Sequence, residues 1–212
     1  MLSKDSQNII LAGPLSEKVT GQSLAFKIVR DNVRHSMLIN TSKFNNKILS
    51  TLFVILKCPF LLFQPTGSVL YFTCSRSNFG FIKDFFIIWT GHIKSMTIIN
   101  HLHGSDFDAF TSQKGIMGSI IRKSYRKISH TILLMKEMED QLVQFPESEY
   151  SVIPNCYEEV LDKFTYDYRK TEEIVITYLS NLIYSKGIIV FLDSAISILD
   201  QGYKVKFKIA GE

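Results

Sequence analysis

Short apolar runs alternate with longer amphipathic stretches along almost the whole chain. A short run rich in β-branched and aromatic residues is typical of a strand buried on both faces, and an amphipathic stretch between two such runs is typical of a helix that connects parallel strands. The pattern predicts strands at residues 8–12, 36–40, 68–73, 96–100 and 131–135. It predicts helices at residues 22–33, 43–56, 81–93, 113–128 and 136–143. We therefore expect an α/β fold built on a parallel, Rossmann-like sheet.

The alternation breaks at residues 145–154, where Pro146 and several acidic and polar residues lead into Ile153-Pro154-Asn155. Stretches of this composition are typical of the connections between domains. We therefore expect a first domain at residues 1–154 and the beginning of a second domain at residues 155–212.

The second domain restarts the same pattern within a short length of chain. The pattern predicts a strand, a helix and a strand at residues 174–178, 186–199 and 204–210, with a turn at Gln201-Gly202. Two strands and one helix cannot cover both faces of a parallel sheet, and the open edge would invite aggregation. We therefore expect the second Rossmann-like domain to be incomplete and the chain to be cut from a longer protein.

The composition is that of a globular protein, with 46% hydrophobic and 21% charged residues. The three cysteines lie far apart and form no C-x-x-C pair, and the apolar run near the N-terminus is too short for a signal peptide. We therefore expect a reduced, cytoplasmic chain. The most apolar stretch, residues 48–63, is interrupted by Lys57 and Pro59 and falls short of the roughly 20 residues of a spanning helix, so we interpret it as a buried or interfacial helix.

The net charge of +4 comes from residues 1–154, which carry the excess of Lys and Arg. Helical spacing over residues 118–128 places Ile121, Tyr125 and Ile128 on one face, and the basic residues Arg122, Lys123, Arg126 and Lys127 on another. Such a helix can lie on the inner face of an anionic membrane as a peripheral contact, or it can be a packed helix with a solvated basic side. The basic residues are not interleaved with stacking aromatics, so no nucleic-acid partner is expected.

The loop at residues 13–23 follows the first predicted strand and opens the first predicted helix. Open α/β sheets bind ligands at this position, where free N–H groups of the helix start favour a phosphate and Gly21 allows a close backbone approach. The spacing does not match G-x-G-x-x-G, which argues against a dinucleotide site of the dehydrogenase type. A simple glycine-bearing turn remains an equal alternative.

The segment at residues 100–108, which reads NHLHGSDFD, lies at the carboxyl end of the fourth predicted strand. Functional loops of this fold class gather there, so His103 could bond a sugar hydroxyl or a donor on the acceptor side, with Asp106 nearby. Two alternatives stay open: the histidines could be bonded to neighbouring carbonyls, or His101, His103, Asp106 and Asp108 could bind a metal. The spacing lacks a recognised metal pattern, so no metal is expected.

The segment at residues 178–187 runs from a predicted strand into a predicted helix start. Lys186 and the free N–H groups of the first turn, near Gly187, could converge on a diphosphate. An exposed lysine with no function is the alternative.

Taken together, these segments resemble the family 4 retaining glycosyltransferases, the large bacterial group that builds lipopolysaccharide, capsule and O-antigen sugars. The resemblance covers nearly the whole chain. It rests on VLYFTCSRSNFGFIKD, INHLHGSDF and YSVIPNCYEE in the first part, and on ITYLSNLIYSKGIIVFLDSAISIL and VKFKIAGE in the second. It implies two facing Rossmann-like domains of the GT-B type, with a nucleotide sugar held mainly by the second.

The resemblance also implies roles for individual residues. It places Gly21 near the donor phosphates, His103 in the active-site cleft, and Lys186 and Gly187 at the departing diphosphate. Many members of the family have an arginine where this chain has Asn181, so charge neutralisation at the diphosphate is expected to rest more heavily on Lys186 or on a residue not in this chain. The pair of glutamates that grips the donor would lie after residue 212. The family works without a metal or another cofactor.

The expected function is therefore transfer of a sugar from a nucleotide sugar to a glycan or lipid-linked acceptor, with little activity in this fragment. A nucleotide-sugar epimerase of the same architecture is one alternative. A non-catalytic membrane-associated module, built on the basic helix and residues 48–63, is the other.

Overall fold

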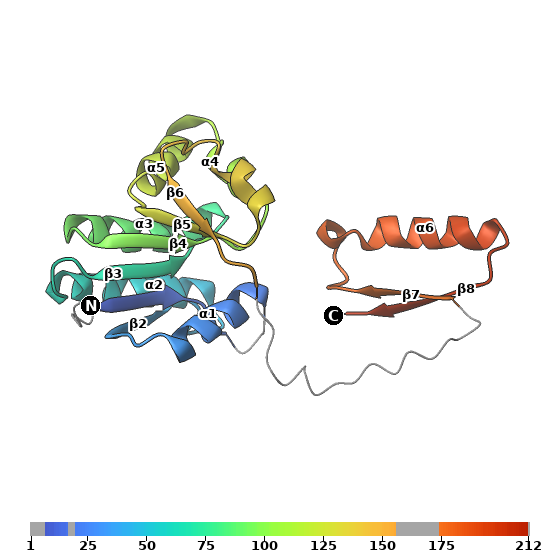
Figure 1. Ribbon diagram of the computed structural model, residues 1–212, viewed down its shortest axis with the longest axis horizontal. Coiled ribbons are helices and arrows are strands. Elements are labelled where there is room, and N and C mark those ends of the chain that lie inside the picture. The colour runs from blue at the N-terminus through green and yellow to red at the C-terminus, as the bar shows by residue number, and fades with distance from the viewer. Residues whose placement is uncertain (1–6, 17–19, 156–173, 212) are drawn as a thin grey trace, which may run out of the picture. The chain divides into compact units, whose positions relative to one another are not determined.

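The computed structural model describes residues 7–16, 20–155 and 174–211. The chain divides into two compact units, residues 1–157 and residues 158–212, which are coloured blue to orange and orange to red in Figure 1. Each unit is described by itself.

Unit 1 contains a parallel sheet of six strands in the order β2-β1-β3-β4-β5-β6 (Figure 1). The strands are β1 (Ile9–Gly13), β2 (Met37–Asn40), β3 (Val69–Thr73), β4 (Thr97–His101), β5 (His130–Leu133) and β6 (Glu149–Val152). The chain runs outward from β1 to β2 and then returns to β3 on the other side of β1, so the strand order reverses between β1 and β3. The α/β class and the Rossmann-like parallel sheet predicted from the sequence are confirmed for this unit.

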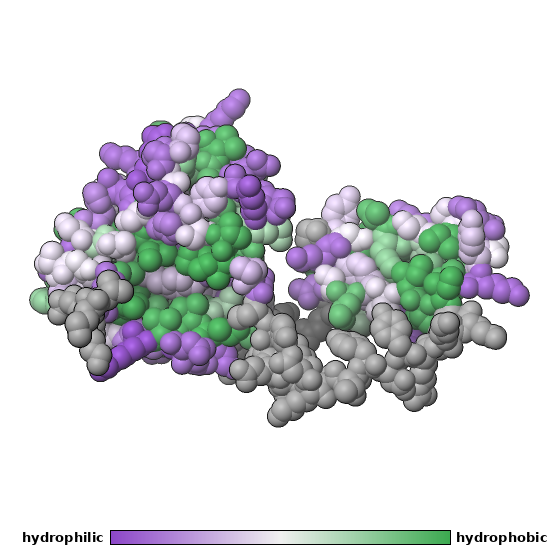
Figure 2. Space-filling view, in the orientation of Figure 1, coloured by the Kyte–Doolittle hydropathy of each residue, from purple (hydrophilic) through white to green (hydrophobic). Residues whose placement is uncertain are grey.

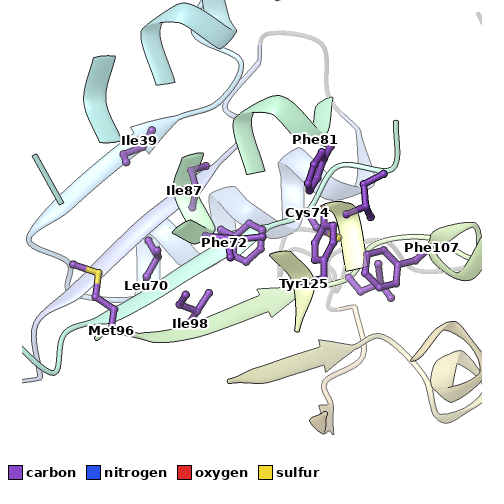
Figure 3. Packing of buried hydrophobic residues seen from close by; sticks show 14 of the residues in the cluster. Ile39, Leu70, Phe72, Cys74, Phe81, Ile87, Met96, Ile98, Phe107 and Tyr125 are labelled. Carbon is purple, nitrogen blue, oxygen red and sulfur yellow. The ribbon is translucent and has the colours of Figure 1, made fainter. Parts of the chain in front are cut away.

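Helices cover both faces of this sheet. One face packs against α1 (Gly21–Asn32), whose Phe26 joins Leu11 and Tyr71 in a small buried cluster. The other face packs against α2 (Lys47–Lys57), the 3-10 helix η1 (Cys58–Phe63), α3 (Asn78–Ile93) and α5 (Gly115–Tyr125). Leu70 and Phe72 point into this second, larger cluster (Figure 3). Because side chains alternate along a strand, Tyr71 between them points to the other face, where it packs with Phe26 of α1.

Two short helices complete unit 1 beyond the carboxyl ends of the strands. The first is α4 (Phe107–Thr111), which begins in the segment that follows β4, and the second is the 3-10 helix η2 (Lys136–Leu142). Phe107 packs edge-on against Tyr125, with ring centroids 5.0 Å apart, and so anchors α4 to α5. The loop after β4 is therefore held on the core.

The prediction of an irregular break at residues 145–154 was wrong in one respect, because β6 lies within it and pairs with β5. All four residues of β6 are exposed, as suits a strand at the edge of the sheet. An edge strand has no need of a continuous apolar run, so the pattern that revealed the other strands was missing here.

Unit 2 consists of two parallel strands, β7 (Ile174–Leu179) and β8 (Val205–Ala210), with α6 (Ile188–Asp200) packed on them. The helix begins two residues later than predicted. Lys186 ends a 3-10 turn, η4 (Tyr184–Lys186), and Gly187 has φ +79°, which is outside the helical region. The left-handed glycine therefore separates Lys186 from the helix.

Side chains close the amino-terminal ends of the helices that surround the carboxyl edge of the sheet. Thr20 and Ser23 form a reciprocal capping box at α1, Asn46 caps α2, and Ser77 caps α3. These residues fix where each helix begins, and therefore which side chains line that edge.

Within the part of the chain that the structure describes, no helix has both the length and the apolar character needed to cross a membrane.

Candidate functional site

Two buried histidines lie side by side where β4 ends. The ring centroids of His101 and His103 are 4.1 Å apart, and the Tyr71 hydroxyl of β3 lies 2.6 Å from Nδ1 of His101. Both histidines are buried. The neutral ring has one donor and one acceptor nitrogen, so whichever role Nδ1 of His101 takes toward Tyr71, its Nε2 takes the other.

Burial keeps both imidazoles uncharged. It lowers the pKa of His101 to about 3, with a smaller contribution from neighbouring His103. It lowers the pKa of His103 to about 4, with a smaller contribution from the positive charge of Arg76. At neutral pH the pair therefore offers neutral hydrogen-bonding nitrogens rather than a positive charge.

The Nε2 atoms of His101 and His103 are buried, and neither has a hydrogen-bond partner among the described residues. The same holds for the Thr73 hydroxyl, which sits beside His101 in the register of β3 and β4. Leaving such a group unpaired costs about 1–3 kcal/mol. A ligand hydroxyl is a chemically suitable partner, because it both donates and accepts.

Asn100 shows the same lack of partners on the opposite face of β4. Its amide lies close enough to the Cys74 thiol to lower the pKa of that thiol, although burial raises the pKa overall. Neither its Nδ2 nor its Oδ1 reaches a partner of good hydrogen-bond geometry in the described part of the chain. The contact with the Cys74 sulfur is a weak hydrogen bond, and it leaves the Asn100 amide without a satisfactory partner.

An ion pair between Arg76 and Asp106 borders the histidines. It joins the loop after β3 to the loop after β4, next to Gly104, whose φ is +142°. A Cβ at Gly104 would overlap the Arg76 guanidinium. Asp106, expected near His103 on the acceptor side, has its carboxylate paired with Arg76. Among the residues that the structure describes, no group of three or more His, Cys, Asp or Glu side chains is placed to hold a metal ion.

A buried carboxylate fixes the loop that carries Arg76. Asp84 of α3 accepts hydrogen bonds from the Ser75 N–H at 2.6 Å and from the Tyr125 hydroxyl at 2.7 Å. Burial raises its pKa to about 6, against these hydrogen bonds, which lower it. Asp84 therefore anchors Ser75, which begins the loop that carries Arg76, to Tyr125 of α5.

A cavity of about 640 Å³ lies outside the carboxyl ends of β1, β2 and β3. This is where the strand order reverses, the usual ligand position in open α/β sheets. Most of its lining is hydroxyl-bearing: Ser16, Thr20, Thr41, Ser42, Ser50, Ser75 and Ser77. Lys47 and Lys83 also line it, together with Phe44, Asn45, Phe79 and Gly80.

Lys83 is the more enclosed of the two lysines in this cavity. Its Nζ donates to the Thr41 carbonyl at 3.1 Å, and burial lowers its pKa, with a smaller lowering from nearby Lys47. Two ammonium groups among hydroxyls suit a phosphorylated or polyhydroxyl ligand. The sequence did not indicate this cavity, because its lining comes from separate loops of ordinary serines and threonines.

Gly21 lies at the first position of α1 and lines a different, smaller cavity of about 300 Å³ together with His101, Pro154 and Asn155. The rest of that lining is apolar, and apolar surface is visible over the sheet beside α1 in Figure 2. The helix start is less free than expected, because the Ser23 N–H is bonded to the Thr20 hydroxyl. Residues 17–19 of the expected phosphate loop lie outside the described residues.

Asn181, Lys186 and Gly187 come together in one turn of unit 2. The Tyr178 hydroxyl donates to the Asn181 carbonyl at 3.3 Å and to the Lys186 carbonyl at 3.0 Å, which ties both ends of the turn to β7. The side chains of Asn181 and Lys186 are exposed. The structure therefore groups the three residues expected at the diphosphate, in a position open to solvent.

No protein-family model matches the chain, and no curated protein is significantly similar to it in sequence.

Proposed function

We propose that this chain takes part in transferring a sugar, with retention of configuration, from a nucleotide-diphosphate sugar to a glycan or lipid-linked acceptor. The observation that carries the proposal is the pair of buried neutral histidines with unpaired ring nitrogens, where β4 ends. The two-domain GT-B architecture is part of the same proposal, and the resemblance to family 4 glycosyltransferases supports it.

In such a reaction the bond between the anomeric carbon and the diphosphate oxygen breaks, and the nucleoside diphosphate leaves with the electron pair. The acceptor hydroxyl bonds to the anomeric carbon and loses its proton. The protein has to hold sugar hydroxyls and to stabilise the negative charge that develops on the leaving group. A strong protein base is not required.

The neutral His103 suits the first task, since a buried imidazole can bond a hydroxyl without competition from water. The cavity lined by Lys47, Lys83 and several hydroxyls suits a phosphorylated or glycan ligand on the acceptor side. Asp106 contributes by holding Arg76 beside His103.

The turn of unit 2 suits the second task. Lys186 brings a positive charge, Gly187 presents backbone without a side chain, and the first N–H groups of α6 follow directly. Asn181 can add a hydrogen bond but no charge. Lys186 is therefore the residue on which diphosphate binding depends most in this proposal.

The test is a titration of the chain with UDP, GDP and ADP, followed by calorimetry and by amide NMR. We expect at least one nucleoside diphosphate to bind and to shift the amides of residues 181–190. Lys186→Ala should weaken binding about tenfold, the loss of one charged hydrogen bond. The matched control, Lys204→Ala, removes an exposed lysine at the amino end of β8 and should leave binding unchanged.

Failure of all three diphosphates to bind would overturn the donor half of the proposal, as would equal binding by both variants. The acceptor half is tested separately with His103→Gln. That variant should weaken the binding of an oligosaccharide acceptor, measured by calorimetry, far more than it lowers the melting temperature, and a lower melting temperature with unchanged binding would count against a ligand-binding role.

A further inference from the structure

The outer side of the helix layer in unit 1 exposes an unusual amount of apolar surface. On α2 the residues that point away from the sheet are Leu49, Leu52 and Leu56, each at least half exposed. The residues that point inward include Ser50 and Thr51, whose hydroxyls bond the Phe44 and Lys47 carbonyls. A helix at a water-exposed surface normally has apolar residues toward the core and polar residues toward solvent, and on α2 this arrangement is largely reversed.

The next helix continues the same surface. Phe79, Ile82, Phe86 and Ile93 follow one another on the outer side of α3 at helical spacing, and all four are exposed. α3 packs against α2 and η1 on one side and against α5 on the other. The exposed rows of these helices therefore adjoin, and we call them together the outer apolar face.

The ends of this face are even more open. Phe63 at the end of η1 is 84% exposed, and Ile116 in the first turn of α5 is 82% exposed. Large exposed side chains that adjoin on neighbouring helices are typical of contact surfaces, unlike apolar residues scattered singly over a protein surface. The outer apolar face is therefore a contact surface that requires an apolar partner.

Charge decides which partner fits. α2, η1, α3 and α5 carry a single carboxylate, Asp84, and it is buried. Lysines border the face on both sides: Lys43 and Lys57 lie 4.3 Å and 5.7 Å from the centroid of the Phe53 ring, and Lys123 and Lys127 lie 5.9 Å and 5.1 Å from that of Trp89. An apolar face whose own helices expose lysines and no carboxylate is complementary to anionic lipid.

A second copy of the chain fits less well. Two such faces packed together would bring lysines of both copies into one interface without acidic partners, and like charges in a buried interface are costly. A lipid bilayer instead accepts the leucines and phenylalanines into its apolar part and the lysines at its phosphate level.

We propose that the outer apolar face docks unit 1 on the surface of an anionic lipid bilayer, with α2, η1, α3 and α5 lying in the interfacial plane. Of the basic residues at 118–128, Lys123 and Lys127 take part. Arg122 does not, because its guanidinium donates to the Thr111 and Gln113 carbonyls. Arg126 lies 3.7 Å from the Glu147 carboxylate and is paired with it. Phe79 and Lys47 also line the hydroxyl-rich cavity, so that cavity opens at the edge of the face. Resting on the proposed function, this placement favours a lipid-linked acceptor.

The experiment is co-sedimentation of the whole chain with vesicles of phosphatidylcholine alone and of equal parts phosphatidylcholine and phosphatidylglycerol. We expect binding to the mixed vesicles, weakened by salt. Leu52→Ser combined with Leu56→Ser should lower the partition coefficient at least about tenfold, from the apolar area lost. Lys123→Gln combined with Lys127→Gln should lower it about tenfold or more on the mixed vesicles only.

The matched control is Leu192→Ser combined with Ile196→Ser on α6, which removes exposed apolar residues outside the face and should leave vesicle binding unchanged. Circular dichroism should show that all variants stay folded, since the replaced side chains are at the surface. Absence of vesicle binding, or equal binding by every variant, overturns the proposal. Self-association in sedimentation velocity that Leu52→Ser with Leu56→Ser abolishes also overturns it and assigns the face to a second copy.

Vesicle binding needs neither a nucleotide nor an acceptor. Vesicle binding without nucleoside-diphosphate binding would therefore support the membrane surface and count against the proposed function. Nucleoside-diphosphate binding without vesicle binding would support the proposed function and count against the membrane surface.

Discussion

Unit 1 and unit 2 are built from the same pattern of parallel strands and helices, yet only unit 1 has an extensive core. Buried apolar residues of unit 1 lie on both faces of its sheet. In the described part of unit 2, Ala195 is the only apolar residue in the buried class, and Leu179 on the face of β7 away from α6 is 80% exposed. The same local pattern therefore yields a core only where helices cover both sheet faces.

The largest expected effect tests this difference directly, with one phenylalanine from a strand of each unit. Phe72→Ala removes a fully buried ring and should lower the free energy of unfolding by about 3–5 kcal/mol. Urea unfolding followed by the fluorescence of Trp89, the only tryptophan, measures this loss in unit 1.

Phe207→Ala is the counterpart in unit 2, where the ring is half-buried against Phe191 with centroids 5.9 Å apart. It should cost about 1 kcal/mol or less, because much of the ring already faces water. Hydrogen exchange at the amides of β7 and β8 measures it. Losses of equal size in the two units would contradict the comparison.

The second prediction concerns pH and applies to unit 1 alone. The folded-state pKa values of His101 and His103, about 3 and about 4, lie below the ordinary value of 6.5. The unfolded chain therefore binds more protons, so the stabilisation is present above pH 6.5 and is lost as the pH falls toward 4. Urea unfolding at a series of pH values should show this fall, and His101→Asn with His103→Gln should flatten it.

Asp84 of the same unit should change stability with pH in the direction opposite to that of the histidines. Its folded-state pKa is raised to about 6, so its contribution is present below its ordinary value of 3.8 and is lost as the pH rises through 6. A wild-type stability that rises steadily on acidification from pH 6.5 to 4 would show that Asp84 outweighs the histidines.

The smallest expected difference between the two units is that between one glycine of each. Gly104→Ala should cost about 1–3 kcal/mol, because φ is +142° and the new Cβ would displace Arg76 from its place beside Asp106. Gly187→Ala should cost about 1 kcal/mol, since only its φ of +79° is unfavourable and the space around it is open. Thermal unfolding of the two variants measures the difference, and a larger loss for Gly187→Ala would contradict it.

The candidate site was only partly predictable. His103, Asp106 and Gly21 could be found because each follows or opens an element at the carboxyl edge of a parallel sheet. Tyr71 and Lys83 lie inside β3 and α3, where the sequence pattern indicates core rather than a site, and the pairing of Arg76 with Asp106 joins two loops 30 residues apart. Which residues meet at the edge depends on strand order, and strand order is set by pairing between distant parts of the chain.

The sequence by itself determined where the buried strands and most helices lie, since a strand covered on both faces must be apolar throughout and a helix packed on it must be apolar on one side. It did not reveal β6, whose exposed edge position leaves no apolar pattern, or the true start of α6, which a left-handed Gly187 delays. Only the tertiary structure decided which apolar residues of α2 and α3 face the core and which face outward. Leucine is equally apolar in both places, and burial is a property of what packs against it.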